Sequence, residues 1–276
     1  MSKSYPKGPR ERRVCIFCDQ TARSKEHFWP VWMHKELPPS EPDAKHDRPH
    51  YSYHPSTGPI TKGVVGRPGG VEKLSIRAVC NECNNGWMNQ VEERARPHLT
   101  KMLKGEAVEL SMEDQKNVAQ WIALKSIVSE HSNPETAVTP KNDRVAFRET
   151  GTIPDYFNIY ATTQVTGSHI GLLRNSHGFA LSPDGPQPPF VETTQNIQTI
   201  SFIFGSIFVH VNAARIDNFA LEEKVIIPAF YGTCRLWPPQ SKIMEFPRRP
   251  RLGTDGIQTV SNSIERYIEA SKTTWA

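Results

Sequence analysis

Long apolar runs are missing from this sequence of 276 residues. No stretch of eighteen uncharged apolar residues occurs, whereas a helix that crosses a membrane needs about 20. The N-terminus, MSKSYPKGPRERR, is basic, but the apolar segment that a secretory signal peptide requires does not follow it. We therefore expect a soluble, cytoplasmic protein that has no membrane partner.

Cysteine is also scarce, with five residues in the whole sequence. Four of them form two C-x2-C pairs, and the fifth, Cys234, stands alone. A disulfide-stapled secreted domain is expected to carry a denser and fully paired set. The usage of cysteine therefore favours a reducing compartment, in which thiolates are available as metal ligands.

The two cysteine pairs predict a structural zinc site. Cys15-Ile-Phe-Cys18 and Cys80-Asn-Glu-Cys83 together supply four thiolates, a complete tetrahedral ligand set for one Zn²⁺. Such a closed site leaves no position for a substrate, so it holds the fold and does no chemistry. In a small module of fewer than about a hundred residues, a structural metal stabilises the fold in place of a larger hydrophobic core.

Charge is distributed unevenly along the chain. Residues 1–105 contain 18 Lys and Arg against 11 Asp and Glu, a net charge of +7, whereas residues 106–276 contain 15 against 18, a net charge of −3. A basic N-terminal part would attract a phosphate backbone. A solvated basic surface is the alternative interpretation.

The N-terminal part divides into a flexible basic arm, residues 1–13, and a zinc-knuckle module, residues 14–105. Within the module, 38–70 is dense in Pro, Gly, His and Asp without a period, which predicts an irregular insertion. Apolar and polar residues alternate at the start of residues 74–79, which predicts a short strand. Trp87, Val91 and Ala95 recur at helical spacing, which predicts a helix over 84–96 that Pro97 ends.

Residues 106–276 read as a helix followed by an antiparallel sheet, a domain of unknown role. Ser111 to Asp114 resembles a capping box and opens a predicted helix, 112–131, on which Lys125 shares the apolar spacing. A linking segment follows, and β-branched residues at period two then predict strands. The expected elements are strands 156–160, 169–173, 178–181, 197–204 and 206–211, and a last helix at 260–270. The predicted fold class is therefore α+β.

Two short polar motifs in the zinc-knuckle module suggest a catalytic site. Glu26 and His27 are adjacent, so in an extended segment they point to opposite faces. The carboxylate suits Mg²⁺ or Mn²⁺, and a neutral imidazole can take a proton from water. An incidental surface pair is the alternative. Asn84 and Asn85 follow the second knuckle, where one amide is either a metal ligand or a helix N-cap.

Taken together, these residues resemble the HNH endonucleases, also called the ββα-metal fold. The resemblance covers residues 14–96 and consists of C-x2-C, then Glu26-His27 with Pro30 three residues later, then C-x2-C-Asn84 leading a helix. It is similar to a zinc-knuckle group of bacterial and phage proteins. The resemblance implies Glu26 and Asn84 as ligands of a catalytic Mg²⁺ or Mn²⁺, His27 as general base, and double-stranded DNA as substrate.

Alternatives remain beside this resemblance. Asn85 and Asn89 are fallback ligands, and Glu92 offers a further carboxylate for which a solvated helix surface is the other explanation. The family's usual Asn before the second knuckle is Ser75 here. That departure permits a second hypothesis, in which the protein is a catalytically inactive zinc-stapled module that binds nucleic acid or protein. The C-terminal sheet domain is a possible site for a regulatory partner or ligand.

Overall fold

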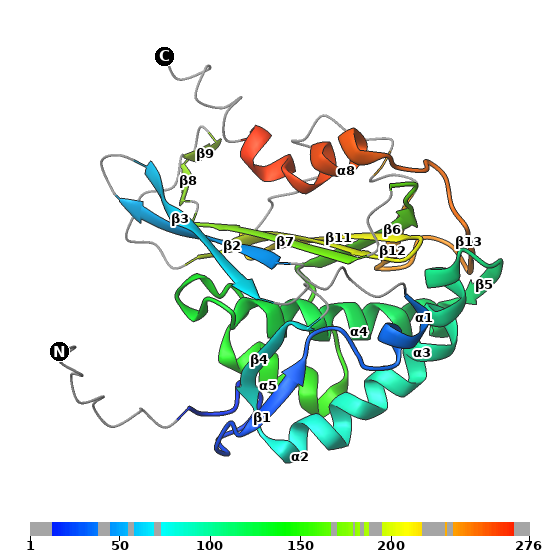
Figure 1. The fold of residues 1–276 in the computed structure, drawn as a ribbon, viewed down its shortest axis with the longest axis horizontal. Coiled ribbons are helices and arrows are strands. Elements are labelled where there is room, and N and C mark those ends of the chain that lie inside the picture. Colours follow the sequence, from blue (N-terminus) through cyan, green and yellow to red (C-terminus); the bar gives the residue numbers. More distant parts are fainter. Residues whose placement is uncertain are drawn as a thin grey trace.

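The computed structural model describes residues 13–37, 45–54, 58–68, 73–166, 170–178, 180–182, 185–187, 195–216, 230 and 234–267. Within them the fold is a mixed α+β arrangement whose largest sheet is antiparallel and has five strands. Figure 1 shows this sheet through the middle of the molecule, with helix α4 (Met112–Glu130) on one side and helix α8 (Thr254–Ser261) on the other. None of the described helices combines the length and the apolar character that crossing a membrane requires.

The strands of the five-stranded sheet are arranged in space in a different order from their order in the sequence. Its spatial order is β12-β6-β11-β10-β7, and each neighbouring pair is antiparallel. A tight turn at Gly205 (φ +56°) joins the two central strands, and a Cβ there would collide with the carbonyl oxygen of Leu103. The strands are β6 (Phe157–Thr163), β7 (Ile170–His177), β10 (Ile197–Phe204), β11 (Ile207–Ala214) and β12 (Arg235–Trp237).

Helix α4 (Met112–Glu130) covers one face of this sheet. The predicted capping box is confirmed, because Ser111 Oγ accepts from the Asp114 backbone N–H and the Asp114 carboxylate accepts from the Ser111 N–H at 3.0 Å. The Trp121 ring packs on Phe204 of β10, with 5.7 Å between ring centroids. Nearly every residue of α4 from its second turn onward is buried, so the helix lies within the core.

Helix α8 (Thr254–Ser261) covers the opposite face. It begins before the predicted last helix, which was expected to start at Val260. Two further pairs of strands complete the C-terminal half, and α5 lies in the segment that the sequence pattern predicted to be a link. These elements are β5 (Val108–Ser111) with β13 (Ile243–Phe246), β8 (Ala180–Ser182) with β9 (Gly185–Gln187), the 3-10 turn η3 (Pro134–Thr136) and α5 (Lys141–Thr150).

The N-terminal part is a two-stranded sheet followed by a long helical segment. Strand β1 pairs antiparallel with β4, which confirms the predicted strand before the second knuckle. Pro97 does not end the following helix, which continues to Lys104 because Leu99, Met102 and Leu103 beyond the proline are buried. The elements are β1 (Ser24–His27), α1 (Met33–Glu36), β4 (Ser75–Val79), α2 (Asn81–Cys83), η2 (Asn84–Met88) and α3 (Asn89–Lys104).

The insertion over 38–70 is not irregular where the structure describes it. Strands β2 (Lys45–His54) and β3 (Gly58–Pro68) form an antiparallel hairpin. Backbone groups make the hydrogen bonds of a hairpin, and any residue other than Pro supplies both a donor and an acceptor. A composition without a period therefore does not exclude strands.

One hydrophobic cluster contains residues of both halves of the chain, from Cys15 to Phe246.

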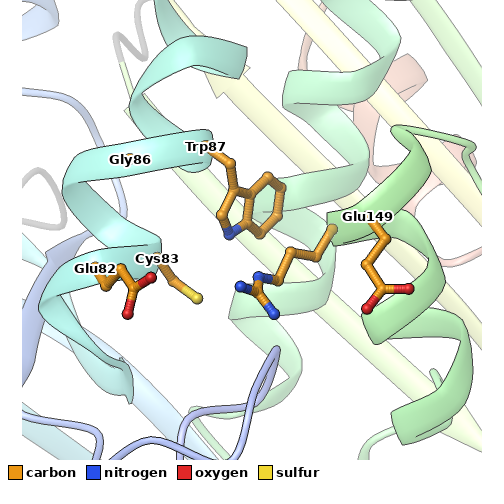
Figure 2. A pocket seen from close by; sticks show the side chains of 6 residues that line it. Glu82, Cys83, Gly86, Trp87 and Glu149 are labelled. Atoms are coloured by element: carbon orange, nitrogen blue, oxygen red, sulfur yellow. The ribbon is translucent and has the colours of Figure 1, made fainter.

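Helix α5 approaches the start of the long helical segment, where the rings of Trp87 and Phe147 meet edge to face at 5.8 Å. A hollow of about 340 Å³ opens between these two elements, and Figure 2 shows the side chains around it. Its lining residues are Glu82, Cys83, Gly86, Trp87, Arg148 and Glu149.

Candidate metal centre

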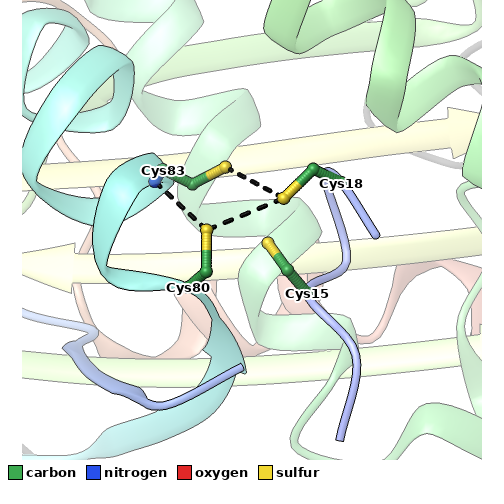
Figure 3. Close-up of side chains that lie close together, drawn as sticks. All are labelled: Cys15, Cys18, Cys80 and Cys83. Carbon is green, nitrogen blue, oxygen red and sulfur yellow. Dashed lines mark hydrogen bonds between the residues drawn. The ribbon is translucent and has the colours of Figure 1, made fainter. Parts of the chain in front are cut away.

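The four cysteines of the two knuckles converge on one point, as the sequence predicts. Their Sγ atoms all lie within 4.8 Å of one another, and Figure 3 shows the side chains directed toward a common centre. Cys18 Sγ lies 3.6 Å from Cys80 Sγ and 3.7 Å from Cys83 Sγ. Four Zn–S bonds of about 2.3 Å give a tetrahedron with edges of about 3.8 Å. The sulfur spacing therefore fits a zinc site with four thiolate ligands.

Backbone hydrogen bonds shape both knuckles. In the first, the Cys15 N–H donates to the Gln20 carbonyl at 2.8 Å and the Ile16 N–H donates to the Ala78 carbonyl at 2.9 Å, which joins the knuckle to the end of β4. In the second, Cys80 is the N-cap of α2, and its Sγ accepts from the Cys83 N–H at 3.3 Å. The N-cap alternative for Asn84 or Asn85 is therefore wrong, because the helical segment begins at Asn81, before the predicted start at residue 84, and Cys80 caps it.

Burial and mutual proximity shift the pKa values of thiols in this cluster. Burial raises the pKa of the Cys83 thiol, and burial is the largest of the effects that raise the pKa of Cys18. Burial acts in the same direction on Cys80, but the Cys83 N–H and the neighbouring thiols outweigh it and hold the Cys80 pKa below its usual value. Thiolates crowded at this distance repel one another, and a divalent ion removes that repulsion by binding all of them.

Glu26, the predicted first ligand of the catalytic metal, points into the protein. Its side chain is 7% exposed, and its Oε1 lies 2.5 Å from the ammonium of Lys125, which is 1% exposed. The same ammonium donates to the backbone carbonyl of His27 at 3.2 Å. The chain thus already places one cation beside this carboxylate.

Glu92 joins this buried charge cluster from α3. Its Oε2 lies 3.8 Å from Lys125 Nζ, and its Oε1 accepts from the Trp32 indole N–H at 3.1 Å. Burial raises the pKa of Glu92, while the charge of Lys125 acts in the opposite direction. A solvated helix surface is therefore the wrong description of Glu92, which faces the same ammonium as Glu26.

His27, the predicted general base, points outward. Side chains along β1 and β4 alternate, so Glu26 and Ile76 are buried while His27 and Ser75, which pair across the two strands, are exposed. The exposed side chains on and next to these two strands are otherwise mostly cationic. They are Arg23, Lys25, Lys73 and Arg77, and together with His27 and Ser75 we call them the outward face of the β1–β4 sheet.

The predicted asparagine ligands lie at the start of the helical segment. The Asn84 amide nitrogen donates to Ser24 Oγ at 2.8 Å, which ties this segment to the first residue of β1 and leaves the amide oxygen outside that bond. Asn85 and Asn89 are exposed. They do not share an α-helical face, because the backbone at Gly86 leaves helical geometry between them (ψ −108°).

Lys125 is the residue of this site that sequence reasoning missed. Its signal was present, since a lysine stood at an apolar position of the predicted helix 112–131, where a buried charge needs a partner. The structure supplies that partner from β1, 99 positions earlier. No family model, curated protein or solved structure matches this chain.

Proposed function

We propose that this protein is a divalent-metal-dependent endonuclease of the HNH, or ββα-metal, type that hydrolyses phosphodiester bonds of DNA. The observation that carries the proposal is the outward face of the β1–β4 sheet. It presents an exposed His27 on two strands whose other exposed side chains include the cations Arg23, Lys25, Lys73 and Arg77. Such a face attracts a phosphate backbone and places it next to an imidazole.

Each part of the site then has a defined task. His27 takes a proton from the attacking water. Glu26 and Asn84 hold Mg²⁺ or Mn²⁺, which when bound stabilises negative charge on the phosphate and on the leaving oxygen. The contact with Lys125 uses Oε1 of Glu26, and an ionised carboxylate has a second oxygen that a metal can use. The zinc of the four-cysteine site keeps β1 next to the helical segment.

The test is cleavage of supercoiled plasmid by full-length protein with Mg²⁺ or Mn²⁺, with and without EDTA. We expect His27→Ala to retain zinc and folding but to cleave about 10²–10⁴-fold more slowly. Glu26→Gln and Asn84→Ala should instead shift the response to added metal. His98→Ala, on α3, is the matched control and should cleave at the wild-type rate. A wild-type protein that fails to cleave with either metal overturns the proposal.

A second candidate function has its own observation. The Glu26 carboxylate is buried and already neutralised by Lys125 at 2.5 Å. This favours a zinc-stapled module that binds nucleic acid or protein on the same outward face without hydrolysis. DNA binding that is equally tight with and without divalent metal, together with no cleavage, would identify this function.

A further inference from the structure

We propose that Lys125 is a positioning residue that holds both members of the Glu26-His27 pair. The inference rests on the proposed nuclease function. One ammonium donates to Glu26 Oε1 at 2.5 Å and to the His27 carbonyl oxygen at 3.2 Å. These two bonds fix the side chain of the predicted metal ligand and the backbone of the predicted base relative to each other.

The geometry suits this role because Lys125 stands on a rigid element. It lies in the second half of α4, is 1% exposed, and its ammonium is 5.9 Å from the Trp121 ring. The capping box fixes the start of α4, and the sheet packs along it. His27, by contrast, is exposed at the end of a four-residue strand, β1, which pairs with β4 in a sheet of two strands. The bond from Lys125 therefore restrains the end of β1 from the interior side.

Stability alone is a poor explanation for this arrangement. Removing an ammonium and two carboxylates from water is costly, and well-packed apolar side chains often replace buried ion pairs without loss of stability. Groups that hydrogen-bond to a metal-ligating carboxylate orient it, and their removal typically lowers metal affinity or activity about 10–100-fold. Lys125 has the contacts of such a group, with Glu92 at 3.8 Å as a second counter-charge.

The experiment compares Lys125→Met with Lys116→Met in full-length, zinc-loaded protein. Lys116 is the matched control, because it lies on the same helix but is exposed. The first measurement is the NMR signal of the His27 imidazole without added divalent metal, assigned with His27→Ala. The second is kcat for plasmid cleavage in Mg²⁺ or Mn²⁺, and the third is DNA affinity in EDTA.

We expect Lys125→Met to shift the His27 signals and to lower kcat about 10–100-fold while the DNA affinity stays unchanged. Lys116→Met should change none of the three. A folded Lys125→Met protein with the wild-type kcat overturns the inference. If the wild-type protein does not cleave DNA, the nuclease proposal fails, and the His27 signals alone then decide the inference: a shift supports it and unchanged signals overturn it.

Lys125→Met leaves the buried Glu26 and the partly buried Glu92 without this cation, so folding is checked first by thermal melting. If Lys125→Met does not fold, Lys125→Arg is measured in its place, because arginine keeps the positive charge. A guanidinium forms paired bonds to both oxygens of a carboxylate and so takes the oxygen that the metal needs. We expect a higher metal concentration for half-maximal cleavage in this variant. An unchanged metal response in folded Lys125→Arg would show that the ion pair is structural only.

Discussion

The ring of Phe28, in the N-terminal part, lies 5.7 Å from the ring of Phe202 on strand β10 of the five-stranded sheet. Phe28 directly follows β1 and is fully buried. Trp29 continues the contact, with its ring 6.2 Å from Phe202 and 5.8 Å from Phe204. The segment that carries Glu26 and His27 is therefore packed on the C-terminal sheet. We expect the two parts to unfold together.

The first prediction concerns this shared core. Phe28→Ala should destabilise the protein by about 3–5 kcal/mol, because it removes a fully buried aromatic ring. Zinc release, followed with a chromophoric chelator, and loss of circular dichroism should occur in one transition at a lower temperature. Val31→Ala is the control, since Val31 is 57% exposed and its truncation should leave the melting temperature nearly unchanged. Two well-separated transitions would contradict a shared core.

The second prediction concerns the metal. Cys80→Ser should abolish stoichiometric zinc and destabilise the whole protein, because metal-binding energy is folding energy at such sites and the N-terminal part shares its core with the C-terminal sheet. Cys234→Ser changes a cysteine that is equally buried but lies outside the cluster, so it should retain one zinc per chain. Elemental analysis after purification without chelators measures both. Wild-type protein without zinc would rule out the site.

The third prediction concerns the outward face. The double variant Lys25→Ala/Arg77→Ala should bind DNA more weakly and with a smaller dependence on salt. Each lost phosphate contact lowers the slope of log K against log salt by about 0.9. Fluorescence anisotropy over a range of salt concentrations measures the slope. Lys116→Ala, a cation on the exposed side of α4, is the control, and an equal change in slope there would argue against the outward face.

The fourth prediction concerns pH. His210 is fully buried between Ser201 Oγ, 2.9 Å from Nδ1, and Ser263 Oγ, 3.5 Å from Nε2. Burial lowers its pKa from 6.5 to about 3, against a smaller opposing effect of Asn212. Between these pH values the unfolded chain binds a proton that the folded protein does not. The contribution of His210 to the free energy of unfolding is therefore fully present above pH 6.5 and is lost as the pH falls toward 3.

Chemical denaturation at pH 7 and pH 4.5 measures this loss of stability. His210→Gln should reduce the difference in stability between the two pH values. Part of the difference should remain, because burial also lowers the pKa of His131 to about 3. An unchanged pH dependence in His210→Gln would show that His210 does not titrate in this way.

Local patterns predicted several elements well. The strand at 197–204 has the predicted bounds, and the Ser111 capping box and the cluster of four cysteines are where the sequence places them. These features depend on neighbouring residues or on a fixed ligand chemistry. The helix after the second knuckle was predicted to stop at Pro97 but runs to Lys104. The burial of residues beyond Pro97 outweighs the loss of the hydrogen bond that proline removes. The rule that proline ends a helix considers only neighbouring residues and does not include this burial.

The sequence by itself determined the ligand set of the metal centre, the α+β class and the adjacency of Glu26 and His27. Only the tertiary structure decided what surrounds that pair. It places Lys125 beside Glu26 across 99 residues, directs His27 outward among cations, and ties Asn84 to Ser24. These relationships follow from how α4, β4 and the helical segment at Asn84 come together around β1. Packing between distant segments depends on the whole core at once, so no spacing in the sequence encodes it.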